Sequence, residues 1–198
     1  MTLILSKKYN PLFESKARYF IITGGRGSGK SFAVTVFLTL LTMSRGIRVL
    51  FTRFTMTSAH LSIIPEFLEK IGLLGFDEAF NINKAEVVNA KNKSDILFRG
   101  IKTSAGNQTA SLKSLQGIST WVLDEAEELV DENIFDTIDL SIREKNIQNR
   151  VILILNPVTK EHWIYKRFFE EKGIEGGFNG VKDNVCYIHS TYLDNKDN

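Results

Sequence analysis

Short, continuously apolar runs separated by polar loops recur along the chain. Residues 19–23, 48–52 and 150–155 are rich in β-branched and aromatic side chains, and each run ends at a glycine or a polar residue. Runs of this length without a polar face are typical of strands that are buried on both sides of a sheet. A fourth run, 121–123, ends at an acidic residue. The pattern therefore predicts a sheet in the core of the molecule.

Helical patterns alternate with these strands. Residues 31–43 are apolar on most faces, as expected of a helix packed against a sheet. Strand 19–23, this helix and strand 48–52 make a strand–helix–strand unit, which implies parallel strands. The fold class predicted is α/β, with a mostly parallel central sheet flanked by helices.

The remaining segments fill in this architecture. Residues 58–71 predict a helix with Ser58 as its cap and Pro65 as its weak point. Residues 80–100 alternate apolar and polar positions around a polar turn, which favours short antiparallel strands. The other predictions are a loop at 103–109, an acidic helix after residue 124, a helix at 163–171, a glycine-rich turn at 173–180 and a strand at 185–189.

Composition narrows the class of protein. The chain has 198 residues, 43% of them hydrophobic, which is enough to bury a substantial core. The single cysteine, Cys186, excludes a disulfide framework and a cysteine-rich zinc site, and it fits a reducing cytosol. The longest apolar stretch, 32–41, is too short to span a membrane. We expect one folded intracellular domain over residues 1–198, with no membrane partner.

One loop carries a phosphate-binding pattern. It lies between strand 19–23 and helix 31–43 and has the spacing G-x-x-x-x-G-K-[ST]. Glycines let consecutive backbone N–H groups wrap a phosphate, and the positive end of the following helix faces the same anion. Lys30 would reach the β- and γ-phosphates, and the Ser31 hydroxyl would bind Mg²⁺. The predicted nucleotide-binding residues are Gly24, Gly25, Arg26, Gly27, Ser28, Gly29, Lys30 and Ser31.

Two acids directly follow the strand at 121–123. Asp124 would hold the metal, while its neighbour Glu125 would orient and activate the attacking water. We interpret the remaining acids before residue 133 as a solvated helix start, where negative charge favours the helix dipole. Those acids are Glu127, Glu128, Asp131 and Glu132.

Four further positions have two interpretations each. Asn156 follows strand 150–155, where a polar side chain would reach the crevice and sense the γ-phosphate, but Asn-Pro also starts ordinary turns. Arg26 would act as an arginine finger in cis or pair with a nearby acid. Arg99 and Arg143 are candidate fingers in trans, although both fit ordinary surface arginines better.

The charge distribution agrees with a basic phosphate site that faces an acidic metal site. The formal net charge is only +2, yet residues 1–60 carry nine Lys/Arg and one acid, whereas residues 124–198 carry nine bases and sixteen acids. The basic half contains the phosphate loop, and the acids begin at the predicted metal site. The other N-terminal bases fit DNA contact and a solvated face equally well.

The order and spacing of these motifs resemble the large terminase subunit of tailed bacteriophages, of the PBSX-like type. The segments that carry the resemblance are 24–31, 111–117 leading into 121–129, the strand ending at Asn156-Pro157, and 189–195. The resemblance implies the N-terminal ATPase domain, a phosphate-loop NTPase of the ASCE, RecA-like class. It assigns Lys30 and Ser31 to the phosphate loop, Asp124 and Glu125 to the metal acid and catalytic base, Asn156 to the coupling motif and Arg26 to the loop arginine.

The same resemblance implies a motor that hydrolyses ATP with Mg²⁺ and moves double-stranded viral DNA into a procapsid. Implied partners are DNA, the portal protein and the small terminase subunit, in the host cell cytoplasm at the procapsid portal. The working form would be a homo-oligomeric ring, and the isolated domain is expected to be a monomer and a slow ATPase. Such subunits usually continue into a nuclease domain, so we expect this chain to be the motor half alone and not to cleave DNA.

Other functions stay open at this point. The chain could be an ATP-binding assembly switch with little turnover, or another nucleic-acid motor such as a helicase or recombinase. A small-molecule kinase is disfavoured because Glu125 suits water activation. For adenine recognition, Tyr9, Asn10 and Phe13 are only positional candidates.

Overall fold

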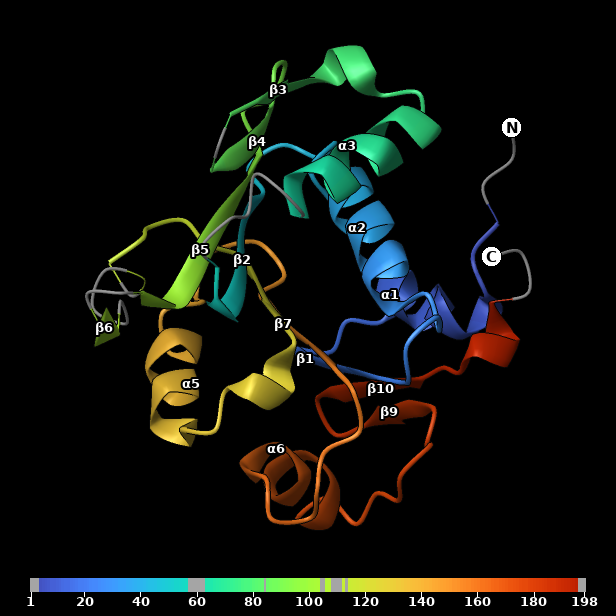
Figure 1. The fold of residues 1–198 in the computed structure, drawn as a ribbon. Helices are drawn as coiled ribbons and strands as arrows, with labels where there is room; N and C mark the ends of the chain where they lie inside the picture. Colours follow the sequence, from blue (N-terminus) through green and yellow to red (C-terminus); the bar gives the residue numbers. More distant parts are fainter. Residues whose placement is uncertain are drawn as a thin grey trace.

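The computed structural model describes residues 4–56, 63–83, 85–103, 106–107, 112 and 114–195. Within these residues one sheet of ten strands runs through the molecule (Figure 1). The strands are β1 (Tyr19–Thr23), β2 (Arg48–Thr55), β3 (Phe80–Ile82), β4 (Glu86–Asn89), β5 (Asp95–Thr103), β6 (Gly106–Asn107), β7 (Thr120–Asp124), β8 (Arg150–Leu155), β9 (Gly180–Lys182) and β10 (Val185–His189).

The centre of the sheet is parallel. The strand order is β3-β4-β5-β2-β7-β8-β1-β10-β9, with β6 paired to β5. Every pair from β5 to β10 along this path is parallel, whereas β3, β4, β6 and β9 attach antiparallel. The predicted α/β class with a mostly parallel sheet is confirmed, and so are the short antiparallel strands around residues 80–100.

Helices cover both faces of the sheet. The helical segments are η1 (Lys7–Tyr9), α1 (Asn10–Glu14), α2 (Lys30–Leu41), α3 (Ile63–Leu73), η3 (Asp77–Ala79), η4 (Ala126–Glu128), α5 (Glu132–Asp139), α6 (Trp163–Tyr165), η5 (Lys166–Glu170) and η6 (Tyr192–Asp194). Helices α1, α2 and α3 pack into one hydrophobic core, and η4, α5, α6 and η5 pack into a second. Figure 1 shows these two groups on opposite sides of the strands.

The strands supply both cores by alternation. In β1, Phe20 and Ile22 face the core of α1–α3, and Ile21 between them faces the other core. All three side chains are fully buried. This explains why the runs read as continuously apolar, since neither face of a central strand meets water. Cys186 of β10 is also fully buried, beside Phe20 of β1.

Several local predictions need correction. Pro65 lies inside α3 and does not interrupt it, while Ser58 is outside the described residues. The sequence pattern missed β9 and the N-terminal pair η1 and α1, because each is too short to show a periodicity. The segment at 163–171 is one α-helical turn followed by a π-helical one.

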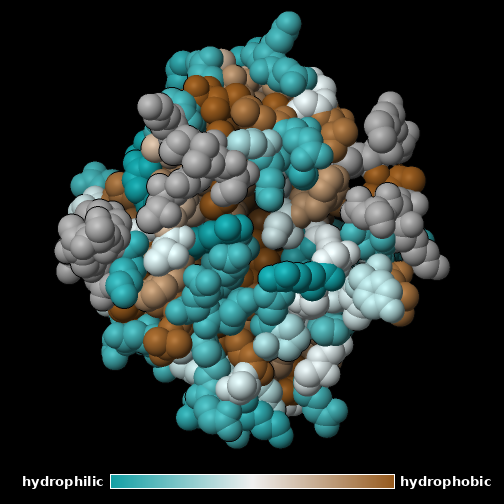
Figure 2. All heavy atoms as spheres, viewed as in Figure 1, coloured by the Kyte–Doolittle hydropathy of each residue, from teal (hydrophilic) through white to brown (hydrophobic). Residues whose placement is uncertain are grey.

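The face of the molecule seen in Figure 2 has no single dominant apolar or polar patch. Hydrophilic and hydrophobic residues are interspersed on the side shown in Figure 2. In the part of the chain that is described, no helix is both long and apolar enough to cross a bilayer.

Candidate nucleotide-binding site

The predicted phosphate loop joins the carboxyl end of β1 to the first turn of α2. Gly27 and Gly29 have φ values of 75° and 81°, in the left-handed region that glycine adopts at low cost. Gly29 is the N-cap of α2, so the N-terminal N–H groups of that helix face the loop interior. Gly24 is glycine for a different reason, because a Cβ there would lie 2.1 Å from the Ser190 carbonyl oxygen.

A cleft of about 330 Å³ opens over this loop. The loop residues from Gly25 to Phe32 line one side of it. Side chains from the ends of β2, β7 and β8 and from η4 line the other side, namely Arg53, Asp124, Glu125, Glu127 and Asn156. The cleft thus unites the residues predicted for the phosphate loop, the metal site, the catalytic base and the coupling motif, except Gly24, which lies against Ser190.

The register of the strands explains this meeting. Thr23, the last residue of β1, lies opposite Leu155, the last residue of β8, and Asp124 of β7 lies opposite Ile154. The three parallel strands therefore end at one level, and the residues that follow them share one edge.

Lys30 folds back onto its own loop. Its Nζ donates to the carbonyl oxygens of Gly24 at 2.5 Å and Gly25 at 3.0 Å, and lies 3.4 Å from Asn156 Oδ1. Burial lowers the pKa of the Lys30 amine, although the carboxylates of Glu127 and Asp124 oppose the shift. The Lys30 amine is therefore held beside the phosphate loop by uncharged oxygen acceptors.

Asp124 forms an ion pair with Arg53, one of the N-terminal bases to which the sequence alone assigned no role. Arg53 Nη2 lies 2.6 Å from Asp124 Oδ2, and Arg53 Nε donates to the same oxygen at 2.8 Å. Asp124 is only 3% exposed, so this arginine supplies the charge that a buried carboxylate needs. Burial alone would lower the pKa of Arg53, but Asp124 and then Glu125 outweigh it and raise the pKa.

Glu125 sits at a sharp backbone turn. Its φ is 53°, a left-handed conformation that is uncommon for a residue with a side chain. Glu125 Oε2 lies 3.7 Å from Arg53 Nε. Burial raises the pKa of the Glu125 carboxyl, Arg53 lowers it, and the neighbouring acids raise it further, so that the net direction is upward.

Glu127 belongs to the cleft and not to a solvated helix start. Its Oε1 accepts a hydrogen bond from Asn156 Nδ2 at 2.6 Å, and among the described residues its Oε2 is buried without a hydrogen-bond partner. The sequence interpretation missed it because it grouped Glu127 with acids that do serve α5. Asp131 caps that helix, and Glu132 pairs with Arg167. The usable signal was the position of Glu127, only two residues beyond Glu125.

Comparisons with known proteins identify the family. The family model described as "Phage terminase large subunit" matches residues 16–196, nearly the whole chain. The chain belongs to the phage terminase large subunit family. This confirms the resemblance found in the sequence motifs.

Individual relatives agree with the terminase assignment. The large terminase subunit of Bacillus phage SPP1 is 25% identical over 211 residues, covering 96% of this chain and 47% of the relative. The chain thus spans about half the length of that curated relative.

Two solved structures show the same fold. The large terminase of a thermophilic bacteriophage superposes with a TM-score of 0.74 at 13% identity, covering 98% of this chain and 48% of that one. The N-terminal domain of the DNA packaging ATPase from bacteriophage phi29 gives 0.69 at 18% identity, covering 94% and 97%. The terminase of the thermophilic phage is also known in complexes with ADP and with ATP-gamma-S.

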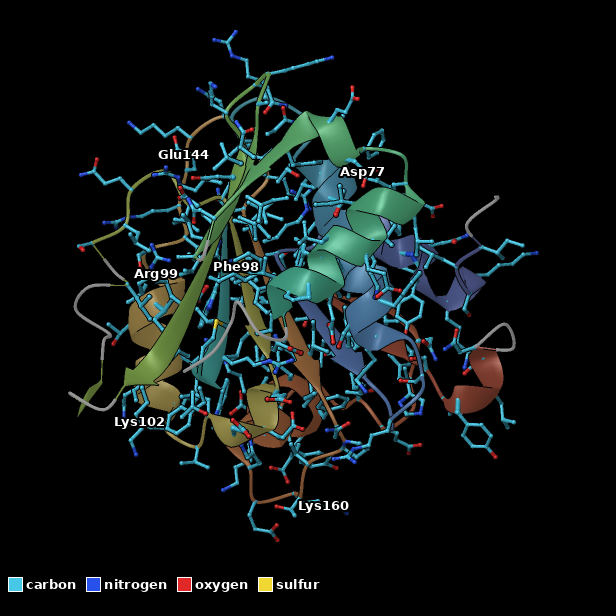
Figure 3. All side chains as sticks on the ribbon, turned by 45° about the horizontal axis from the view of Figure 1, so that its top comes forward. Asp77, Phe98, Arg99, Lys102, Glu144 and Lys160 are labelled. Atoms are coloured by element: carbon cyan, nitrogen blue, oxygen red, sulfur yellow. The ribbon has the colours of Figure 1, made fainter. Side chains whose placement is uncertain are left out.

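The arginines suggested as fingers occupy different places in this terminase fold. Arg26 is exposed and lines the cleft. Arg99 of β5 lies outside the cleft lining and donates to the carbonyl oxygens of Ala85 at 3.2 Å and Phe98 at 2.8 Å. In Figure 3, Arg99 and Phe98 point to opposite sides of β5. Arg143 is an exposed residue away from the cleft lining.

The donor set suits a hard divalent cation. Ser31 and Asp124 bring a hydroxyl and a carboxylate to the same cleft. Among the described residues no cluster of three or more His, Cys, Asp and Glu side chains is placed to hold a metal. Mg²⁺ commonly takes only one or two protein oxygens and fills its shell with phosphate oxygens and water, so the residues present fit it.

Proposed function

We propose that residues 1–198 act as a single ATPase domain that hydrolyses ATP with Mg²⁺ and so drives translocation of double-stranded viral DNA into a procapsid. The observation that carries the proposal is the composition of the cleft. A phosphate-binding loop, a buried acid, a second acid at a sharp turn and a polar strand-end residue reach it from three neighbouring strands. The ADP and ATP-gamma-S complexes of the thermophilic phage terminase support a nucleotide as the ligand.

The residues divide the work by their chemistry. Backbone N–H groups of the loop bind the phosphates, and Lys30 exchanges the carbonyl oxygens of Gly24 and Gly25 for phosphate oxygens. Glu125 accepts a proton from the attacking water, because its carboxylate lines the cleft beside the phosphate loop. Asn156 senses the γ-phosphate, and Arg26 stabilises the negative charge that develops on it.

Ser31 and Asp124 would hold the cation, which supplies positive charge to the β- and γ-phosphate oxygens when bound. Arg53 occupies one Asp124 oxygen in this structure. To hold the cation, Asp124 would therefore share its carboxylate with Arg53 or release it.

The partners follow from the family. The phi29 relative is part of a "viral genome packaging motor assembly", with a TM-score of 0.70 to this chain. By analogy with that assembly, we infer that the working form is a ring of terminase subunits around double-stranded DNA. The ring would bind the portal protein and the small terminase subunit, in the host cell cytoplasm.

Phosphate release tests the assignment of the base and the loop together. Glu125→Ala should slow steady-state hydrolysis about 100-fold or more, because general-base contributions are of that order. Lys30→Ala should abolish ADP binding in calorimetry. Exposed Glu128 is the matched control, and Glu128→Ala should hydrolyse ATP at the wild-type rate.

Two results would contradict the proposal. Equal phosphate release by Glu125→Ala and the wild type would exclude Glu125 as the base, and unchanged ADP affinity of Lys30→Ala would exclude the loop as the phosphate site. A single-turnover measurement at saturating protein separates a motor from an assembly switch, since a switch would bind ATP without releasing phosphate.

A further inference from the structure

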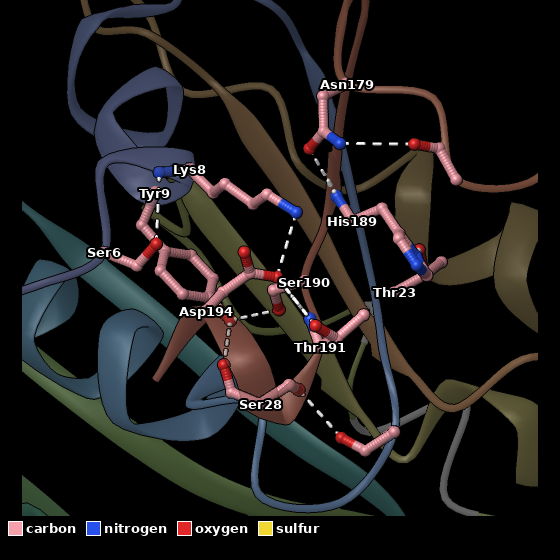
Figure 4. Close-up of polar contacts among 12 residues, drawn as sticks. Ser6, Lys8, Tyr9, Thr23, Ser28, Asn179, His189, Ser190, Thr191 and Asp194 are labelled. Carbon is pink, nitrogen blue, oxygen red and sulfur yellow. Dashed lines mark hydrogen bonds and ion pairs between the residues drawn. The ribbon is translucent and has the colours of Figure 1, made fainter. Parts of the chain in front are cut away.

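Two segments far apart in the sequence close over the outside of the phosphate loop. One is the N-terminal segment 6–9, which includes η1, and the other is 190–195, called the strap below, which contains η6. Figure 1 shows the blue N-terminal segment and the red C-terminal segment on the same side of the molecule. Figure 4 shows Lys8 and Tyr9 of the first segment beside Ser190, Thr191 and Asp194 of the strap, with Ser28 of the phosphate loop below them in this view.

A buried chain of hydroxyl groups connects these segments to the loop. The Tyr9 hydroxyl donates to the Ser28 carbonyl oxygen at 2.9 Å and lies 2.6 Å from Ser190 Oγ. The phenol has one proton and the carbonyl can only accept, so Ser190 must be the donor to Tyr9. Tyr9, Ser28 and Ser190 are at most 2% exposed. The direction of both hydrogen bonds is therefore fixed.

The end of the strap holds the preceding peptide of the loop. Asn195 Nδ2 donates to the Gly27 carbonyl oxygen at 3.0 Å. The strap itself is braced at Asp194, which accepts from Thr191 N at 2.8 Å and from Lys8 Nζ at 2.9 Å. Lys8 and the Thr191 groups lower the pKa of this carboxyl to about 2, so Asp194 stays ionised at neutral pH.

These contacts determine where two loop N–H groups point. In a planar trans peptide the carbonyl oxygen of one residue and the N–H of the next point in opposite directions. When Tyr9 holds the Ser28 carbonyl oxygen outward, the Gly29 N–H must point inward, and when Asn195 holds the Gly27 carbonyl oxygen outward, so must the Ser28 N–H. Neither Tyr9 nor Asn195 lines the cleft, so both act from behind the loop.

We propose that Tyr9, Ser190 and Asn195 are positioning residues for phosphate binding, which set the orientation of the Ser28 and Gly29 N–H groups before nucleotide arrives. This inference rests on the proposed function, namely that the loop binds ATP. Glycine at 27 and 29 makes such support necessary, since a glycine peptide rotates more freely than any other. The entropy cost of ordering these loop peptides arises when the chain folds, so phosphate binding does not incur it again.

The proposal predicts a particular kinetic signature. Loop N–H groups contact the phosphates in the ground state and in the transition state alike. Loss of their orientation should raise the KM for ATP and weaken ADP binding while kcat changes little. A variant that only loosened the fold would lower the melting temperature without this split.

The experiment compares matched substitutions by calorimetric titration with ADP and by steady-state kinetics with ATP, at a temperature where every variant is folded. Tyr9→Phe and Asn195→Ala should each weaken ADP binding about five- to tenfold, the size expected for losing one hydrogen bond. The controls are Tyr19→Phe, whose hydroxyl donates to Asp139 at the other end of β1, and Asn133→Ala on α5. Both controls should stay within about twofold of the wild type.

The outcomes separate the two proposals. Wild-type protein that binds no ADP would overturn the proposed function and this inference with it. If the wild type binds ADP, and Tyr9→Phe and Asn195→Ala bind it equally tightly, this inference alone is overturned, as it is by a fall in kcat with unchanged KM. If Tyr9→Phe does not fold, Asn195→Ala decides, because Asn195 is partly exposed and only its carboxamide is removed.

Discussion

At the scale of single residues, Arg53 controls the charge of the cleft. It is the cation that faces both acids at the end of β7, at 2.6 Å from Asp124 and 3.7 Å from Glu125. Two adjacent carboxylates beside a phosphate-binding loop repel each other and the anion they would serve. Arg53 offsets that repulsion, so the acids can stand ready before a nucleotide and a divalent cation bind.

Substitution of Arg53 should move the pH dependence of hydrolysis. In the proposed mechanism Glu125 acts as a base in its ionised form, so activity would be full above its pKa and lost as the pH falls through it. Burial already holds this pKa above the ordinary 4.5, and Arg53 opposes that rise. Arg53→Gln should raise the pKa further and shift the acid limb of the kcat profile to higher pH. An unshifted limb would contradict the pairing, and Arg143→Gln, an exposed arginine away from the cleft, is the control.

Glu127 should act on hydrolysis through Asn156. The 2.6 Å hydrogen bond from Asn156 Nδ2 fixes the carboxamide with its oxygen toward Lys30. Glu127→Ala and Asn156→Ala should each lower kcat about tenfold, and the double variant should be no worse than the stronger single one, a coupling of about 1.4 kcal/mol. A double-mutant cycle measured by phosphate release checks this. Strictly additive losses would show that the two side chains work independently.

These residues also show how far the sequence could lead. The phosphate loop, Asp124 and Glu125 were predictable because local spacing and strand context define them. Arg53 and Glu127 were not, since their roles depend on partners 71 and 29 positions away along the chain. Such pairings appear only when the strand order is known.

At the scale of elements, the segment that carries Glu125 and Glu127 is anchored by aromatic packing. The Phe135 ring of α5 lies 5.2 Å from the Trp121 ring of β7 and 4.7 Å from the Trp163 ring of α6. Trp163 Nε1 donates to the Leu129 carbonyl oxygen just after η4. The short η4 could not hold its position by its own hydrogen bonds, so β7, α5 and α6 hold it in place by packing.

Predictability at this scale depended on length and burial. The central strands β1, β7 and β8 match the apolar runs nearly residue for residue, because burial on both faces leaves no other pattern. Segments of three to five residues, such as β9 and α1, carry too few positions for a period to appear. Their places come from pairing with β10 and packing against α2.

At the scale of the whole molecule, the sheet order makes the site. Strands β7, β8 and β1 are neighbours although β1 is separated from them by some hundred residues, and their carboxyl ends are level. Apolar runs alone predict strands and not this order. Strand β10, on the far side of β1, continues directly into Ser190, so the sheet also carries the residues that brace the loop from behind.

Because Cys186 is buried in the sheet, labelling of its thiol can be used to measure unfolding of the native chain. It is the one cysteine of the sequence, lies between β1 and β9 in the sheet, and burial raises the pKa of its thiol to about 11. A thiol reagent at neutral pH should therefore label the folded protein only when β10 opens. In urea, the same reagent should label one thiol per chain. Rapid labelling of the folded protein would contradict this burial. The exposed variant Tyr192→Cys could then carry a fluorophore alone, without removal of the native thiol.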